Sequence, residues 1–280
     1  MKYLAGVDGA TIAADHCGDL DDPAVLLFHG GGQTRHAWGG ALEALAAAGW
    51  NAWSFDLRGH GDSSWSDDGQ YTIERFAGDV AAVAGQFDRP SIVGASLGGI
   101  ASLAAVGEGL APDVHSLVLV DITPSFEADG ARRVHDFMTQ GINGFASLDD
   151  VADAVAAYLP QRPRPRDPDG LRKNLRQGDD GRWYWHWDPN FLQLGDSMEE
   201  RHPFGSDERM FAAARAVEIP TLLVRGALSD VVTADGAAAF TTFIPHAEVA
   251  EVGGAGHMVA GDRNDDFNAA ILDFLDRHRP

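Results

Sequence analysis

The chain contains one cysteine, Cys17, among its 280 residues. A single thiol excludes internal disulfides and the multi-cysteine cages that hold structural metals. The amino-terminal stretch MKYLAGVDGA is interrupted by Asp8, so it lacks the apolar run of a signal peptide, and no stretch of the chain approaches the length of a membrane helix. We therefore expect a soluble, cytoplasmic protein that has no contact with a membrane.

Positive charge is also scarce. The 21 Lys and Arg residues are outnumbered by 42 Asp and Glu residues, which gives a formal net charge of -21. Nucleic-acid binding needs clustered basic side chains, so we expect no nucleic-acid partner. Anionic membrane surfaces are disfavoured for the same reason. The acidic excess is best explained by solubility.

Short apolar runs alternate with longer segments that have helical spacing. Most of the runs are continuous rather than alternating in polarity, which is typical of parallel strands covered on both faces. The strand–helix rhythm predicts an α/β fold, a doubly wound or barrel sheet. KYLAGV and TIAADHC are expected to form an antiparallel hairpin at the sheet edge. The predicted sheet strands are AVLLFHG (24–30), WNAWSFD (50–56), PSIVGAS (90–96), HSLVLVD (115–121), PTLLVRG (220–226) and AEVAEVGG (247–254).

One long segment interrupts this rhythm. Residues 123–215 contain helical patterns, a Pro/Arg-rich stretch and the aromatic sequence GRWYWHWDP, but no further strand of the main sheet. Because the sheet needs strands from both sides of this segment, we interpret it as an inserted helical cap. The core would then comprise residues 1–122 and 216–280.

Ser96 lies in Gly94-Ala95-Ser96-Leu97-Gly98, which follows an apolar strand and precedes a helix. In that context G-x-S-x-G predicts a nucleophile elbow, a strained turn that presents a serine at the carboxyl edge of a sheet. Two alternatives remain: a small residue in a tight turn, or a dinucleotide-binding loop. The second lacks the middle glycine of G-x-G-x-x-G and follows a late strand.

A serine nucleophile needs a base, and His257 is the best placed of the 11 histidines. It follows the last predicted strand in the glycine-rich loop GGAGHMV, just before the final helix. The base in turn needs a carboxylate to fix its tautomer. We favour Asp230, which follows the strand PTLLVRG, over Asp121, which ends HSLVLVD. This choice rests on position and on the chain order Ser…Asp…His.

The loop His29-Gly30-Gly31-Gly32-Gln33 follows the strand AVLLF. Glycines allow the backbone to approach a substrate and aim N–H groups at it, so we expect Gly31 to donate to an oxyanion together with Leu97, and Gly32 to contact substrate. The alternative is a phosphate cradle, but no Lys-Ser/Thr follows the glycines.

Together, HGGG, DLRGHGDSS (56–64), GASLGG, the Asp230 loop and GAGHMV resemble the α/β-hydrolase superfamily in their order along the chain. YTIERFAGDVAAV followed by the elbow is similar to the branch that holds enol-lactonases, small esterases and perhydrolases. DLRGHGDSS is expected to be a structural turn.

The resemblance implies a serine hydrolase of small carboxylic esters or lactones that works through an acyl-enzyme and needs no cofactor or metal. Ser96 would attack, His257 would relay the proton and Asp230 would orient His257. The alternatives are a C–C bond hydrolase of meta-cleavage diketones and a ligand receptor without turnover. The partner expected is a small-molecule substrate, and the sequence leaves homodimer formation open.

Three of the chain's seven tryptophans lie in GRWYWHWDP. In an extended segment Trp183, Trp185 and Trp187 share one face. They would form either a small core of the cap or a roof over the cleft, in which Trp185 and Trp187 contact substrate.

Overall fold

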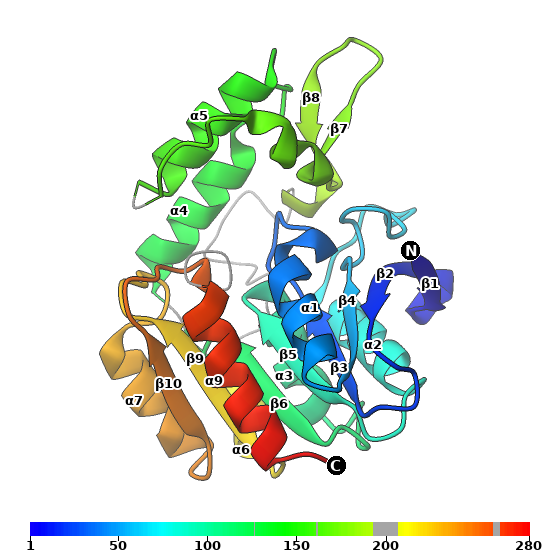
Figure 1. Cartoon of the computed structure of the whole chain (residues 1–280), viewed down its shortest axis with the longest axis vertical. Coiled ribbons are helices and arrows are strands. Elements are labelled where there is room, and N and C mark those ends of the chain that lie inside the picture. Colours follow the sequence, from blue (N-terminus) through cyan, green and yellow to red (C-terminus); the bar gives the residue numbers. More distant parts are fainter. Residues whose placement is uncertain (126, 161, 193–206, 260–263) are drawn as a thin grey trace.

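A computed structural model describes residues 1–125, 127–160, 162–192, 207–259 and 264–280, and its centre is an eight-stranded sheet (Figure 1). The strand order is β1-β2-β4-β3-β5-β6-β9-β10, and all neighbours are parallel except the β1–β2 and β2–β4 pairs. The strands are β1 (Lys2–Ala5), β2 (Thr11–Cys17), β3 (Ala24–Phe28), β4 (Asn51–Phe55), β5 (Ser91–Ala95), β6 (Ser116–Val120), β9 (Thr221–Gly226) and β10 (Glu248–Val252).

Helices cover both faces of this sheet. One apolar cluster joins one face to α1 and α9, and a second joins the other face to α2, α3, α6 and α7. Successive residues of a strand enter opposite clusters: Val25 and Leu27 of β3 pack with α1 and α9, whereas Leu26 and Phe28 pack with α2 and α3. This double burial explains the continuous apolar runs of the strands. The helices are α1 (Gly39–Ala47), α2 (Ile73–Ala84), α3 (Leu97–Gly107), α6 (Asp207–Arg215), α7 (Ala234–Phe243) and α9 (Asn264–Arg277).

The predicted strands are confirmed as β3, β4, β5, β6, β9 and β10, and the amino-terminal hairpin lies at the sheet edge as β1 and β2. The fold is a doubly wound α/β fold rather than a closed barrel. In the described residues, no helix has the length and apolar character that crossing a membrane requires.

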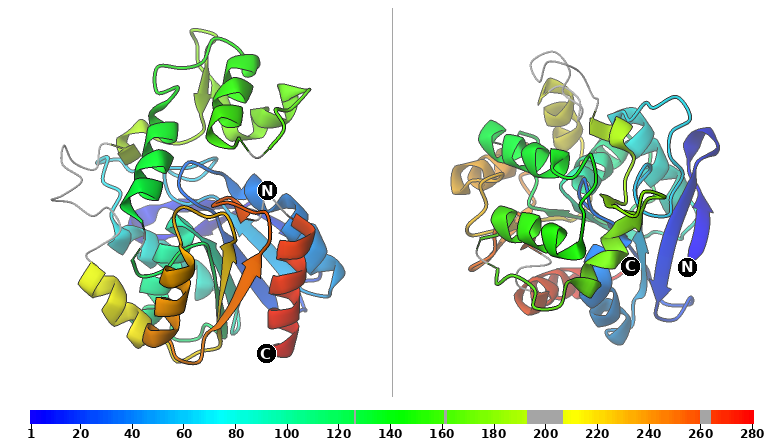
Figure 2. Two further views of the ribbon diagram at one scale, coloured as in Figure 1. Left: turned by 90° about the vertical axis from the view of Figure 1, so that its left-hand side faces the viewer. Right: turned by 90° about the horizontal axis from the view of Figure 1, so that it is seen from above.

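The cap lies over one end of the sheet, as the side view in Figure 2 shows. Its described elements are α4 (Ala128–Thr139), α5 (Leu148–Tyr158), η3 (Pro168–Asn174), β7 (Leu175–Gln177), β8 (Trp183–Trp185) and η4 (Pro189–Leu192). β7 and β8 form a separate two-stranded antiparallel sheet.

The interval that we predicted for the cap, 123–215, also includes α6. This helix packs on α3: a Cβ on Gly107 would lie 2.2 Å from the carbonyl oxygen of Ala213. Met210 and Ala214 of α6 belong to the same apolar cluster as the sheet. Helix α6 therefore belongs to the helical layer of the core.

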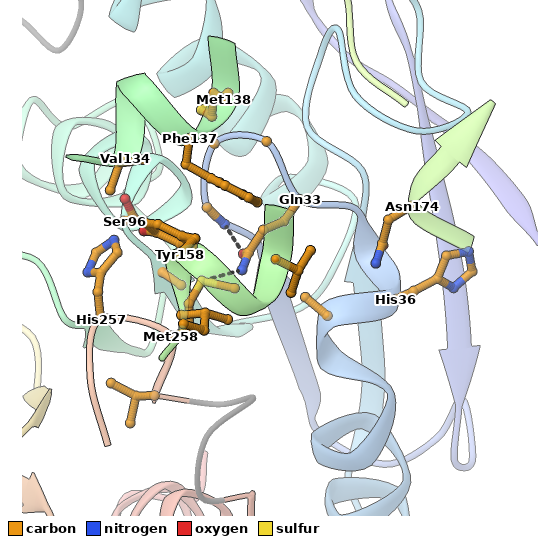
Figure 3. Close-up of a pocket in the computed structure, with 18 of the residues that line it drawn as sticks. Gln33, His36, Ser96, Val134, Phe137, Met138, Tyr158, Asn174, His257 and Met258 are labelled. Atoms are coloured by element: carbon orange, nitrogen blue, oxygen red, sulfur yellow. Dashed lines mark hydrogen bonds between the residues drawn. The ribbon is translucent and has the colours of Figure 1, made fainter. Parts of the chain in front are cut away.

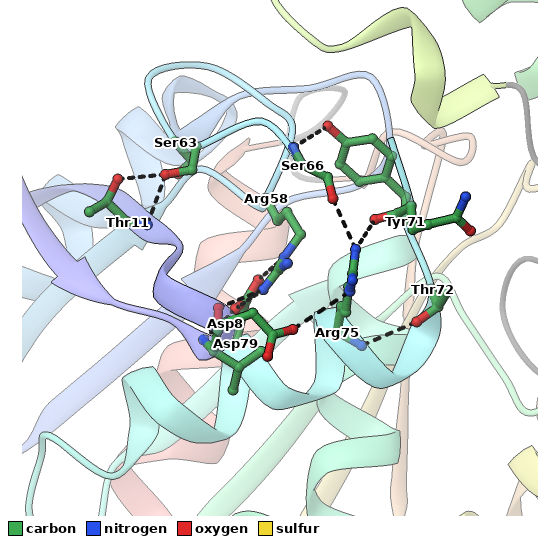
Figure 4. A network of polar contacts seen from close by, with 12 residues as sticks. Asp8, Thr11, Arg58, Ser63, Ser66, Tyr71, Thr72, Arg75 and Asp79 are labelled. Atoms are coloured by element: carbon green, nitrogen blue, oxygen red, sulfur yellow. Dashed lines mark hydrogen bonds and ion pairs between the residues drawn. The ribbon is translucent and has the colours of Figure 1, made fainter. Parts of the chain in front are cut away.

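A buried ion pair ties three segments of the core together (Figure 4). The Arg58 guanidinium donates to both carboxylate oxygens of Asp79 on α2, with Nε and Nη2 each at 2.8 Å. Val7 of the short helix η1 (Val7–Gly9) joins the pair, because its N–H donates to Asp79 Oδ1 at 2.9 Å and its carbonyl accepts from Arg58 at 3.0 Å. The segment that follows β4 is thus fixed to α2 and to the amino-terminal hairpin.

We expect Asp79→Asn to destabilise the protein by about 3–5 kcal/mol, because it leaves the Arg58 guanidinium buried without a counter-charge. Urea unfolding followed by far-UV circular dichroism measures this change. The matched control is Asp68→Asn, which removes a carboxylate that contacts Arg75 at 2.6 Å on the surface. Water screens that pair, so its loss should matter far less. Equal effects of the two substitutions would contradict the structural role of the Arg58–Asp79 pair.

Candidate active site

Ser96 occupies the turn between β5 and α3, and its backbone is strained. Its φ of 45° and ψ of -115° lie outside the regions that L-residues usually adopt. The turn is tight because glycines flank it: a Cβ on Gly94 would lie 2.6 Å from the Gly98 carbonyl oxygen, and one on Gly98 would lie 2.4 Å from that of Phe28. Ser96 therefore stands at the carboxyl edge of the sheet and at the amino-terminal end of α3.

His257 lies in the loop after β10 and lines the same cavity as Ser96 (Figure 3). Its Nδ1 contacts Asp121 Oδ2 at 2.7 Å. An imidazole whose Nδ1–H donates to a carboxylate has its Nε2 available to accept a proton. The figure shows His257 and Ser96 side by side on one wall of the cavity.

Asp121 is fully buried at the end of β6 and has several partners besides His257. Its Oδ1 accepts from the Gly226 N–H at 3.1 Å, and its Oδ2 accepts from the Ser229 hydroxyl at 2.5 Å. Its backbone has a positive φ of 49°, uncommon for a non-glycine residue. These bonds hold the Asp121 carboxylate facing His257.

The prediction that Asp230 contacts His257 is wrong. Asp230 lies in the expected loop after β9, but its carboxylate pairs with Arg133 of α4 in the cap, and its side chain is 39% exposed. The loop instead contributes Ser229, which supports Asp121. The chain order did not distinguish the two acids, because Asp121 and Asp230 both fall between Ser96 and His257.

The glycine loop after β3 lies against Ser96. Gly30, Gly31 and Gly32 all line the cavity, whereas Leu97 does not appear in its lining. The Gly30 N–H donates to Gln33 Oε1 at 2.9 Å, and the Gly32 N–H donates to His60 Nε2 at 3.1 Å. Among the hydrogen bonds within the described part of the chain, none uses the N–H of Gly31 or of Leu97. These two donors remain available to a ligand.

Two buried histidines support this loop from behind, and the sequence did not indicate their role. His60, which lies in the expected structural turn DLRGHGDSS, is fully buried. Its Nδ1 contacts the Arg58 carbonyl at 3.0 Å and so donates there, which leaves Nε2 to accept the Gly32 N–H. His29 acts similarly: its Nε2 accepts the Leu57 N–H at 3.0 Å. Alternating Gly and His in RGHG was the only signal, and it also fits an ordinary turn.

Burial keeps both imidazoles neutral. It lowers the pKa of His60 to about 3, and the neighbouring His29 adds to the effect. Burial likewise lowers the pKa of His29 to about 4. Since each neutral ring has one acceptor nitrogen, protonation would remove the acceptor that holds a main-chain N–H.

The cavity has a volume of about 390 Å³ and lies between the core and the cap. This size suits a small organic ligand. From the cap, α4 contributes Val134, Phe137 and Met138, and α5 contributes Val155 and Tyr158. Figure 3 shows Val134, Phe137 and Tyr158 close to Ser96. The wall nearest the serine is therefore mainly apolar.

The structure separates the two tryptophans that were expected to contact substrate. Trp185 lines the cavity, packs on Phe137 and Phe145 and donates its indole N–H to the Gln140 carbonyl. Trp187 is 3% exposed, does not line the cavity and forms a bridge with His60 at the seam between cap and core. Trp185 is thus part of both the cap core and the cavity wall, whereas Trp187 is buried between the cap and the core.

No group of three or more His, Cys, Asp or Glu side chains in the described ranges is arranged to hold a metal ion. The groups gathered around Ser96 are instead its hydroxyl, the His257 imidazole with the buried Asp121 carboxylate behind it, and the N–H groups of Gly31 and Leu97. That set matches the parts of nucleophilic acyl transfer.

The chain matches the alpha/beta hydrolase fold family over residues 23–263. Esterase Rv0045c of Mycobacterium tuberculosis is 31% identical over 250 residues, which cover 86% of this chain and 78% of that protein. The 2-(acetamidomethylene)succinate hydrolase of Mesorhizobium japonicum is 29% identical over 91% of this chain and 88% of that protein. The solved enol-lactonase of Burkholderia xenovorans LB400 shares the fold, with a TM-score of 0.73 at 21% identity over 98% of this chain and 100% of that chain. This protein belongs to the α/β-hydrolase family.

The low pKa of His60 predicts how stability depends on pH. In the unfolded chain this imidazole titrates near 6.5, whereas in the folded protein its pKa is about 3. Below pH 6.5 the unfolded state therefore binds a proton that the folded state does not, and stability falls by up to about 1.4 kcal/mol per pH unit. His60→Gln keeps an acceptor for the Gly32 N–H but does not titrate.

We expect the difference in unfolding free energy between the wild type and His60→Gln to shrink by about 2 kcal/mol from pH 6.5 to pH 4.5. Urea titrations at several pH values measure it. His135→Gln, which changes an exposed imidazole on α4, is the control and should show a nearly constant difference from the wild type. A constant difference for His60→Gln as well would mean that His60 is not buried neutral.

Proposed function

We propose that this α/β-hydrolase cleaves a small carboxylic ester or lactone through an acyl-enzyme formed on Ser96. The observation that carries the proposal is the strained Ser96 turn facing a cavity beside His257, whose Nδ1 is held by buried Asp121. The name of the Mycobacterium tuberculosis relative, an esterase, supports the choice of ester bonds.

In the proposed reaction, the Ser96 Oγ attacks the carbonyl carbon while His257 Nε2 takes its proton. The carbonyl oxygen becomes an oxyanion that accepts from the N–H groups of Gly31 and Leu97. His257 then gives the proton to the leaving alcohol oxygen, and the acyl group remains on Ser96. A water deprotonated by His257 releases the acid and restores the serine.

Asp121 takes the role that the sequence had suggested for Asp230. Its carboxylate stabilises the imidazolium that forms when His257 accepts the serine proton. The supporting contact is the bond to His257 Nδ1, and the bonds from Gly226 and Ser229 keep the carboxylate in place. Gly32 and Trp185 are proposed to contact substrate, because both line the cavity.

The proposal is tested by turnover of p-nitrophenyl and aliphatic esters, simple lactones and a ring-fission diketone, together with labelling by a fluorophosphonate. We expect ester or lactone turnover and stoichiometric labelling at Ser96. Ser96→Ala should lose labelling and nearly all turnover, about 10⁶-fold, because triad deletions leave only binding and the oxyanion hole. Preference for the diketone would indicate a C–C hydrolase, and labelling without turnover of any substrate would indicate a receptor.

The two aspartates give a second prediction. Asp121→Asn should lower kcat by about 10⁴-fold, because an amide offers the wrong hydrogen-bonding pattern to the imidazole and favours the wrong tautomer. Asp230→Asn removes the same charge from the neighbouring loop and should leave kcat within a few-fold of the wild type. Steady-state kinetics on one ester compare them. If Asp230→Asn is the more damaging change, Asp121 does not orient the base.

A further inference from the structure

The charged side chains of the cavity have one sign. Lys173 and Arg162 line it, and no Asp or Glu appears among the lining residues of the described chain. This is unexpected in a protein with twice as many acidic as basic residues and a net charge of -21. A concave site lined by one sign of charge, with low-dielectric walls, concentrates ligands of the opposite sign.

The end of the cavity that holds Lys173 and Asn174 lies away from the serine. Lys173 and Asn174 end η3 in the cap, and His36 belongs to η2 (Arg35–Trp38) in the core. Figure 3 shows Asn174 and His36 together across the cavity from Ser96 and His257. This arrangement leaves the mainly apolar wall between the reacting serine and the polar end.

The Lys173 ammonium and Asn174 Nδ2 can still donate hydrogen bonds to a ligand. Asn174 Oδ1 accepts from the Thr34 hydroxyl at 2.7 Å, which orients the amide and leaves Nδ2 as a donor. No hydrogen bond or ion pair between described residues involves the Lys173 ammonium. Arg162 differs, because its Nη2 donates to the Met258 carbonyl at 3.1 Å and it has further contacts. Lys173 and Asn174 are therefore the groups that can receive a ligand.

The carboxylates near His36 face Arg35 and do not line the cavity. Asp15 lies 3.7 Å from His36 Nδ1, but it pairs with Arg35 at 2.9 Å. Asp56 and Asp62 also pair with Arg35, and none of the three acids lines the cavity. The pKa of His36 is lowered, chiefly by burial and then by the positive charge of Arg35, so its ring adds a neutral donor or acceptor.

We infer that this end of the cavity is an anion subsite: Lys173 and Asn174 Nδ2 bind a carboxylate that the ester substrate carries away from its reacting carbonyl. The inference rests on the proposed function and specifies its substrate class, a half-ester of a small dicarboxylic acid or a lactone that carries a free carboxylate. The carboxylate pairs with the ammonium and accepts from the amide, while the apolar wall of Phe137, Tyr158 and Trp185 contacts the chain between the two ends.

The test compares monoethyl esters of linear four- to eight-carbon dicarboxylic acids with the same esters in which the free acid is a primary amide. A parallel pair carries the acid or amide on the alcohol side. We expect the wild type to have a higher kcat/KM for the anionic member of at least one pair. Lys173→Gln should reduce that preference about threefold, because Lys173 is exposed and water screens the ion pairs of an exposed ammonium. The loss in kcat/KM should be larger for the anionic ester than for the neutral one.

The matched control is Arg166→Gln, which removes the same charge from the cap at a residue outside the cavity lining. It should keep the wild-type preference, and Lys173→Arg should restore it. A preference that is the same in Lys173→Gln and the wild type, or a wild type that prefers the neutral esters, would overturn the inference while the proposed function stands.

A binding measurement distinguishes failure of the anion subsite from failure of the proposed hydrolase function. Isothermal titration of Ser96→Ala with adipate and with adipamide needs no turnover. We expect adipate to bind more tightly, and the difference to disappear in Ser96→Ala with Lys173→Gln. If no ester or lactone is hydrolysed, the proposed function fails and this titration alone decides the anion subsite. Equal binding of adipate and adipamide would then refute it.

Discussion

The close approach of main chains around Ser96 is the constraint on which the site depends. β5 can turn directly into α3 only because Gly94 and Gly98 carry no side chain, and both sit against neighbouring backbone at distances that no Cβ tolerates. The strained turn places the Ser96 hydroxyl at the cavity. Beside it, the first N–H of α3 makes no hydrogen bond within the described chain. Strain of this kind persists only where the surroundings enforce it, and here the buried parallel strands on both sides of β5 do so.

Buried polar contacts also fix the segments that surround the glycine loop. The Arg58–Asp79 pair fixes the segment after β4, and the Arg58 carbonyl accepts from His60. His60 then accepts the N–H of Gly32 in the loop that faces Ser96. A chain of contacts thus runs from helix α2 to the glycine loop without passing through any group that reacts. Buried networks of this kind specify one geometry because each unpaired member would be costly.

The sequence predicted the parts of this arrangement that depend on local chemistry and failed where packing decides. The strands, Ser96 and His257 each have a local signature: continuous apolar runs, a glycine-flanked serine and a glycine-rich loop after a last strand. Asp121 and Asp230 share residue type, a position after a strand and chain order, and only their contacts in the folded protein separate them. Trp185 and Trp187 likewise share a face of the segment, yet one lines the cavity and the other closes the seam with His60. Local sequence patterns do not predict either of these differences.

The core and the cap contribute different parts of the candidate site. The core supplies Ser96, His257, Asp121 and the glycine loop, and it holds them with main-chain turns and buried bonds that tolerate little change. The cap supplies the apolar wall and Lys173 through side chains of α4, α5, β8 and η3. Under the proposed function, a substitution in the cap would alter which substrate fits, whereas the core would carry out bond cleavage.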